Sequence, residues 1–155
     1  MALGKKTIGI IESKFFNYYK IKAAVAEARA EQDAKGGVTG GDSGHSRKSD
    51  PTAVAAIKHV MPLNYVYIQD GLFEMKIYDP EKWVKIMEYT IVAYENQLIG
   101  TLANRRYFKK EKPDYTFDSM GIGQRTYYDW RDDFITQAIF FAIAEGLISA
   151  EKTQE

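Results

Sequence analysis

The sequence predicts a mainly α-helical protein with a small β-hairpin and a helical core that ends in a C-terminal helix-turn-helix. Apolar residues recur at steps of three and four over most of the chain, which is typical of amphipathic helices. Two apolar-rich runs flank Asp70-Gly71, a strong hairpin turn signal. A glycine turn at 121–123 joins two further helical stretches. With 155 residues, 45% of them hydrophobic, the chain is long enough to bury a core and too apolar to be wholly disordered.

The composition excludes several classes of protein. There is no cysteine, which rules out a disulfide scaffold, a thiolate zinc site and a cysteine nucleophile, and which fits a reducing compartment. No apolar run reaches the roughly 18 residues of a membrane span, and the start lacks the apolar core of a signal peptide. We therefore expect a cytoplasmic protein with no membrane partner.

The N-terminal region, residues 1–34, predicts one amphipathic helix. Its apolar face begins with Ile8, Ile11 and Phe15, which recur at helical spacing. The alanine-rich stretch 23–30 has high helix propensity and supports the same assignment.

Residues 35–49 predict a flexible loop, because they hold five glycines and almost no apolar side chain. A phosphate-binding loop would need Gly-Lys-Ser/Thr entering a helix after a strand, and neither is present. His45 lies in this loop without the neighbours that a metal site needs, and no metal or other cofactor is expected.

The region 50–112 predicts a short helix, a hairpin and a long helix. Asp50 as cap and Pro51 at the first helical position start the short helix, which ends before Pro62. In the hairpin that follows, alternation places Tyr65, Tyr67 and Gln69 on one face of the first strand and Val66 and Ile68 on the other.

Asp79 and Pro80 repeat the cap-plus-proline start, and the pattern predicts a helix from there to about Lys110. Such a helix would be about 45 Å long and would form the spine of the fold. Pro113 ends it. Its apolar face comprises Trp83, Met87, Ile91, Tyr94, Leu98 and Leu102.

The charge is zero in total but unevenly placed. Residues 105–131 carry a net charge of +3, and residues 132–155 carry −4. The positive block opens with five cations opposed only by Glu111: Arg105, Arg106, Lys109, Lys110 and Lys112. They are either a solvated helix end, where cations favour the helix dipole, or a set of contacts to nucleic-acid phosphates.

The region 113–155 holds the most specific signal, a helix-turn-helix followed by an apolar C-terminal helix. A short helix over 116–120, the turn Gly121 to Gly123 and a helix over 124–134 give this arrangement. The spacing turns Tyr127, Phe134 and either Trp130 or Arg131 inward. The side chains on the outer face suit base edges in a DNA major groove: Gln124, Arg125, Tyr128 and, if Trp130 is the inward residue, Arg131.

Two observations temper this reading. A plain helical hairpin would also show outward polar residues. The acidic side chains Asp129, Asp132 and Asp133 would have to face away from phosphates.

Residues 135–148 are apolar nearly all round, which indicates a buried helix or a subunit interface and favours a homo-oligomer.

The segment 120–132 resembles the C-terminal helix-turn-helix of phage-encoded transcriptional regulators of the RinA/ArpU type, a unit similar to sigma-factor region four. The wider plan is also similar: a helix with a Tyr-rich start, a Gly-rich gap, a Ser-Asp-Pro-Thr start at 49–52 and a long helix before the DNA reader. The resemblance spans about residues 16–147, but only residues 120–132 match a sequence motif of the family.

The resemblance implies a sequence-specific DNA-binding activator of phage late genes, which acts on double-stranded DNA in a bacterial host cell. It implies recognition-helix contacts from Gln124, Arg125, Tyr128 and Arg131, with Thr126 at or near the DNA backbone. The chain departs from the family pattern at Gly123, where a Ser-type cap is commoner, and in its acidic recognition helix.

Three alternatives remain. A phage small terminase subunit also couples a helix-turn-helix to an oligomer, but places the DNA reader toward the N-terminus. A factor that binds host RNA polymerase without reading DNA would suit the acidic recognition helix. An enzyme is not expected, because the sequence has no His-centred triad, metal spacing or phosphate loop, and His59 is better explained as a packed or surface residue.

Overall fold

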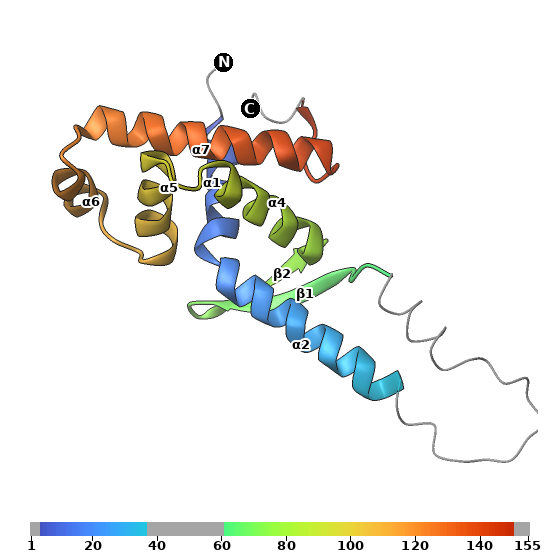
Figure 1. Ribbon diagram of the computed structural model, residues 1–155. Helices are drawn as coiled ribbons and strands as arrows, with labels where there is room; N and C mark the ends of the chain where they lie inside the picture. Colours follow the sequence, from blue (N-terminus) through green and yellow to red (C-terminus); the bar gives the residue numbers. More distant parts are fainter. Residues whose placement is uncertain (1–3, 37–60, 151–155) are drawn as a thin grey trace, which may run out of the picture. The chain divides into compact units, whose positions relative to one another are not determined.

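The computed structural model describes residues 4–36 and 61–150 (Figure 1). It is mainly helical with one two-stranded antiparallel sheet, which confirms the predicted fold class. The chain divides into two compact units, one made of Met1–Tyr18 with Lys82–Glu155 and the other of Tyr19–Glu81. The predicted helix at 51–60, most of the Gly-rich loop, and both histidines lie outside the described residues.

The N-terminal region forms two helices, α1 (Lys5–Phe16) and α2 (Tyr18–Gly36), so the prediction of one helix over 5–34 was wrong. The interruption is Asn17, which has φ −103° and ψ 14°. Its side-chain amide donates to the Ser13 carbonyl at 2.9 Å, and its backbone N–H donates to the same carbonyl. A short polar side chain that bonds locally to the backbone competes with helix continuation.

The hairpin consists of β1 (Tyr65–Asp70) and β2 (Phe73–Tyr78), paired antiparallel with Tyr65 opposite Tyr78. Its two-residue turn begins at Gly71, whose φ of +63° is a conformation that glycine adopts without steric cost. The predicted faces are confirmed, because Val66 and Ile68 are buried while Tyr65 and Tyr67 are exposed.

Helix α2 is tied to its own unit by polar contacts. The Lys20 ammonium donates to the Gln69 carbonyl of β1 at 2.7 Å. The Arg29 guanidinium donates to the Glu81 carboxylate at 2.6 Å and to the Met61 carbonyl at 2.9 Å.

The predicted helix from Pro80 to Lys110 is broken into three pieces, so that prediction was also wrong. They are α4 (Pro80–Ala93), α5 (Leu98–Ala103) and the π-helical turn η1 (Asn104–Phe108). The break lies at Asn96, whose φ is +62°, since asparagine can take the left-handed conformation that ends a helix. Gly100 lets the chain fold back, because a Cβ there would lie 2.2 Å from the Tyr94 carbonyl oxygen. Of the predicted apolar face, Leu98 is exposed.

The core of the larger unit is aromatic and centres on Phe134. Its ring lies 5.0 Å from Phe15, 5.5 Å from Tyr94 and 5.9 Å from Tyr107, measured between ring centroids. These rings come from α1, the turn that follows α4, and η1. Aromatic pairs at such distances stabilise the core beyond the area that they bury.

Two helices complete this unit, α6 (Pro113–Met120) and α7 (Gln124–Ala144). Pro113 occupies the first turn of α6, where a missing N–H has no cost. The predicted reading helix and the predicted apolar helix are one continuous α7. It runs along one side of the unit, and α1 and α5 lie against it (Figure 1).

Candidate nucleic-acid interface

The predicted helix-turn-helix is formed by α6, a three-residue turn and α7. Gly121 has φ +69°, and the N–H of Ile122 donates to the Phe117 carbonyl at 3.0 Å, so α6 ends in a left-handed glycine cap. Gly123 stands at the N-cap of α7 in an extended conformation, without a side-chain cap. The turn therefore depends on glycine at one position and tolerates it at the other.

The inner face of α7 holds this pair of helices to the rest of the unit. Tyr127 and Phe134 are completely or almost completely buried, as predicted. The Tyr127 ring lies 5.9 Å from Phe117 of α6, and its hydroxyl accepts a hydrogen bond from Arg106 at 3.0 Å. The orientation of α7 is thus fixed both by packing and by a polar contact.

The outer face of α7 begins with Gln124 and Arg125, which are both exposed. Neither makes a side-chain hydrogen bond or ion pair with another described residue. Thr126 and Tyr128 are half-buried, and the Tyr128 ring packs edge-on against Tyr127 at 5.0 Å. Of the four predicted base contacts, Gln124 and Arg125 are therefore available at the surface and Tyr128 is available in part, as is Thr126, the predicted contact to the DNA backbone.

Arg131, the remaining predicted recognition residue, is turned toward α1. Its Nη1 lies 3.6 Å from Oε1 of Glu12, and its Nε donates to Oδ1 of Asp132 at 2.8 Å. Its guanidinium also lies 5.0 Å from the Tyr128 ring centroid. With 17% of its side chain exposed, Arg131 belongs to an internal ion-pair cluster.

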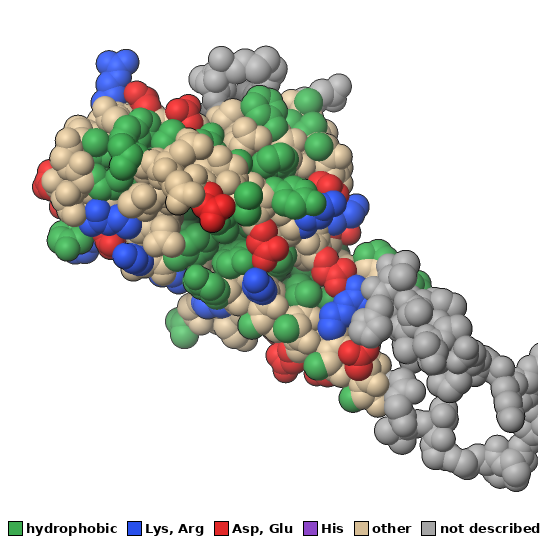
Figure 2. Space-filling model, in the orientation of Figure 1, with side chains coloured by type: hydrophobic (Ala, Val, Ile, Leu, Met, Phe, Trp, Pro, Cys, Tyr) green, Lys and Arg blue, Asp and Glu red, His purple; other side chains and the backbone are tan. Residues whose placement is uncertain are grey.

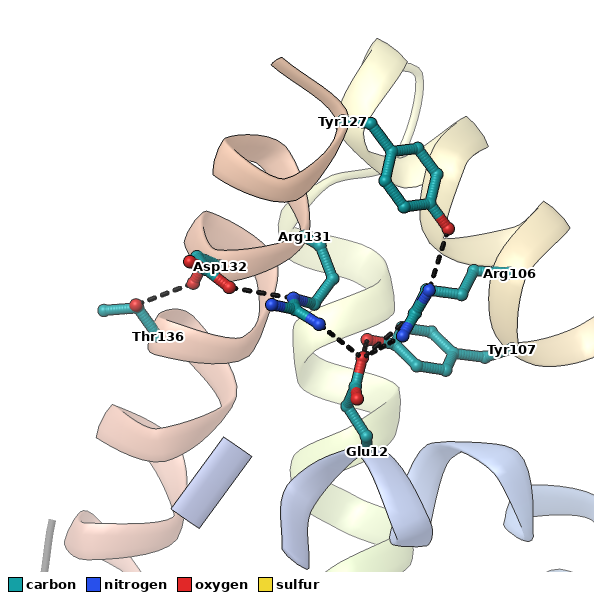
Figure 3. Close-up of polar contacts among 7 residues, drawn as sticks. All are labelled: Glu12, Arg106, Tyr107, Tyr127, Arg131, Asp132 and Thr136. Carbon is teal, nitrogen blue, oxygen red and sulfur yellow. Dashed lines mark hydrogen bonds and ion pairs between the residues drawn. The ribbon is translucent and has the colours of Figure 1, made fainter. Parts of the chain in front are cut away.

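Glu12 is the centre of this cluster, which we call the Glu12 cluster (Figure 3). Its Oε1 accepts hydrogen bonds from Arg106 at 2.9 Å and from the Tyr107 hydroxyl at 2.8 Å. The cluster links α1, η1 and α7, and it consists of Glu12, Arg106, Tyr107, Tyr127, Arg131 and Asp132.

The environment keeps the donors of the Glu12 cluster protonated. Burial opposes the charge on Arg106, but the hydrogen bond to Tyr127 and the Glu12 carboxylate outweigh it and raise the pKa of Arg106. Burial raises the pKa of Tyr107 well above its usual value, and the charge of Glu12 acts in the same direction. Both groups therefore remain protonated near neutral pH and can donate hydrogen bonds to Glu12.

The five-cation run does not form one basic patch. Arg105 donates to Glu111 at 2.8 Å and to Ser119 at 2.9 Å, and Arg106 belongs to the Glu12 cluster. The three lysines of the run, Lys109, Lys110 and Lys112, are exposed. On the face shown in Figure 2, Lys and Arg side chains are interspersed with Asp and Glu.

The π-helical turn explains why neighbouring residues of the run differ. In η1 the N–H of Lys109 bonds to the carbonyl of Asn104, five residues back. A π-helical turn contains one residue more than an α-helical turn, which shifts its side chains around the helix axis. Here Arg106 and Tyr107 both reach Glu12, while Arg105 is directed toward Glu111. A sequence pattern read at 3.6 residues per turn cannot anticipate this.

Glu12 was not predicted as a functional residue. The available signal was its position, because it lies four residues after Ile8 and three before Phe15, on the apolar face of α1. A single carboxylate on such a face needs a partner once it is buried. Its partners lie more than 90 residues away, so local pattern could not name them.

The apolar end of α7 is covered largely by the chain itself. Ile135, Ala138, Ile139 and Ala142 are buried within the unit, whereas Phe140 is 61% exposed. Part of the expected subunit interface is therefore accounted for by the monomer, and Phe140 remains outside it.

In residues 4–36 and 61–150, no group of three or more His, Cys, Asp or Glu side chains is placed to hold a metal ion. Among the helices described there, none has the length and apolar character needed to cross a membrane. Comparison of the chain with protein-family models, curated proteins and solved structures found no match.

Proposed function

We propose that this protein binds double-stranded DNA through α6 and α7 and regulates transcription. The observation that carries the proposal is the first turn of α7, where Gln124 and Arg125 are exposed directly after a glycine-capped helix turn. In helix-turn-helix proteins this part of the second helix contacts base edges in the major groove.

The side chains in this turn suit the task. Arginine bonds guanine bidentately and glutamine bonds adenine in the same way. Arg125 has no ion pair with another described residue, so binding would not first require breaking an internal contact. Lys109 and Lys112 are exposed nearby in the sequence and are candidates for phosphate contacts, which supply affinity without sequence preference.

The resemblance of residues 120–132 to RinA/ArpU-type regulators supports a narrower form of the proposal, an activator of bacteriophage late genes in the host cytoplasm. In this form the protein acts as a homo-oligomer, since a two-fold dimer matches a palindromic operator. Phe140 is exposed on α7 and is a candidate contact between copies.

The proposal is tested by DNA binding of the purified full chain. A random-duplex selection identifies a preferred site, and fluorescence anisotropy then compares this site with a scrambled duplex over a salt series. We expect the preferred duplex to bind roughly 1,000-fold tighter or more, which is the range of specific binders. The absence of any preferred sequence would contradict regulation by operator recognition.

A second candidate is a factor that binds host RNA polymerase without reading DNA. It is favoured by Asp129 and Asp133, which are exposed on α7 at i and i+4. Binding to host RNA polymerase, together with a duplex selection that yields no preferred sequence, would support it. A large ring of subunits in light scattering would instead favour a small terminase subunit.

A further inference from the structure

Helix α7 carries two cations, and the structure treats them differently. Arg125 is exposed and makes no ion pair with another described residue. Arg131 lies between two carboxylates, Glu12 at 3.6 Å and Asp132 at 2.8 Å, with 17% of its side chain exposed. The two positions differ by six residues, which corresponds to about 240° around the helix axis.

The Glu12 cluster is internally neutral. It contains the guanidiniums of Arg106 and Arg131 and the carboxylates of Glu12 and Asp132. Glu12 and Arg106 each expose 13% of their side chains, so this end of the cluster is largely removed from water. Removing one partner of an ion pair in such a place destabilises the protein, because the remaining buried charge is left without a partner.

We propose that Glu12 is a positioning residue that, together with Asp132, withholds Arg131 from DNA, so that α7 meets DNA with Arg125 as its only available cation. This inference rests on the proposed DNA-binding function. A released Arg131 would add a flexible charge able to reach phosphates on any sequence, and phosphate contacts strengthen non-specific binding. Glu12 and Asp132 therefore set specificity without touching DNA.

The arrangement explains how a weakly charged recognition helix can serve a specific reader. With Arg131 neutralised, the exposed start of α7 offers one guanidinium and one amide, Arg125 and Gln124. Both make directional hydrogen bonds with base edges. Binding then depends on the base sequence more than on the number of phosphates neutralised.

The test is the slope of log binding constant against log salt concentration on a scrambled duplex. This slope counts neutralised phosphates, and a loss of packing alone does not change it. Arg131→Gln should leave the slope and the specific-to-non-specific ratio unchanged, since Glu12 keeps its contacts with Arg106 and Tyr107. Glu12→Gln with Asp132→Asn removes both partners of Arg131 and should steepen the slope by about 0.9, and a further Arg131→Gln change should restore it.

Each outcome is decisive. A shallower slope for Arg131→Gln, or an unchanged slope for a folded Glu12→Gln/Asp132→Asn double variant, overturns the inference while leaving DNA binding in place. Should circular dichroism show that the Glu12→Gln/Asp132→Asn double variant does not fold, Arg131→Gln alone decides. If the unmodified chain binds no duplex at any salt concentration, the proposed function fails and this inference fails with it.

Discussion

The two faces of α7 contain the same residue types in different roles. On the inner face, Arg131 is held by Glu12 and Phe134 is buried among three aromatic rings. On the outer face, Arg125 and Phe140 are exposed. An arginine or a phenylalanine therefore has no fixed role in this helix. Its helical phase and the partners that it meets decide whether it supports the fold or remains available for binding.

The largest expected effect comes from removing the inner phenylalanine. Phe134→Ala should lower the free energy of unfolding by about 3–5 kcal/mol, because it empties the centre of the aromatic core. Urea denaturation followed by circular dichroism measures this. The matched control, Phe140→Ala, should change the free energy by less than about 0.5 kcal/mol. An equally large loss for Phe140 would show that another chain covers its face in solution.

The next effect concerns the outer arginine and DNA. Arg125→Ala should weaken binding to the selected duplex by about 1–3 kcal/mol and should affect a scrambled duplex much less. Arg125→Lys keeps the charge and loses the bidentate geometry, so it should resemble alanine on the selected duplex and the unmodified chain on the scrambled one. Fluorescence anisotropy on both duplexes measures the effect. Equal weakening on both would reassign Arg125 to a phosphate contact.

The joint between the two helices gives a smaller effect. Gly121→Ala should destabilise the protein by about 1–2 kcal/mol, because an L side chain is strained at φ +69°. No atom lies within 4 Å of a Cβ built there, so the whole effect comes from the backbone. Gly9→Ala in α1 meets equally open space and should stabilise by about 0.5–1 kcal/mol. Thermal unfolding of both variants compares them, and the same sign for both would contradict this explanation.

The smallest effect is expected from a single lysine of the basic run. Lys109→Ala should weaken binding to every duplex equally. If this side chain neutralises one phosphate, the slope of log binding constant against log salt concentration should become shallower by about 0.9. Lys85 pairs with Glu145, at the opposite end of α7 from Arg125. Lys85→Ala should therefore leave the slope unchanged. Similar slopes for the two variants would exclude Lys109 from the interface.

The sequence predicted those elements whose signals are local. The hairpin around Gly71 and the glycine-capped turn at 121–123 depend on residues that determine backbone conformation directly, and both are present. The helices over 5–34 and 80–110 were predicted too long. Asn17 and Asn96 interrupt them, and asparagine in a helical pattern is a weaker stop signal than proline or glycine.

The candidate site was predictable only in its outer half. Exposure of Gln124 and Arg125 follows from helical periodicity alone. Arg131 is turned inward toward Glu12, which is contributed by a helix at the other end of the chain. The loss of Arg105 and Arg106 from the basic surface has the same kind of cause, since their partners are set by tertiary packing and by a π-helical turn.

The Glu12 cluster also joins parts of the chain that are synthesised at different times. The contacts of Glu12 with Arg106 and Tyr107 join residues 94 and 95 positions apart. During synthesis, α1 leaves the ribosome long before its partners exist, and these contacts close only after most of the chain has been made. Contacts of such long sequence separation form late and slow folding. A chain that ends before η1 therefore leaves the Glu12 carboxylate without Arg106, Tyr107 and Arg131.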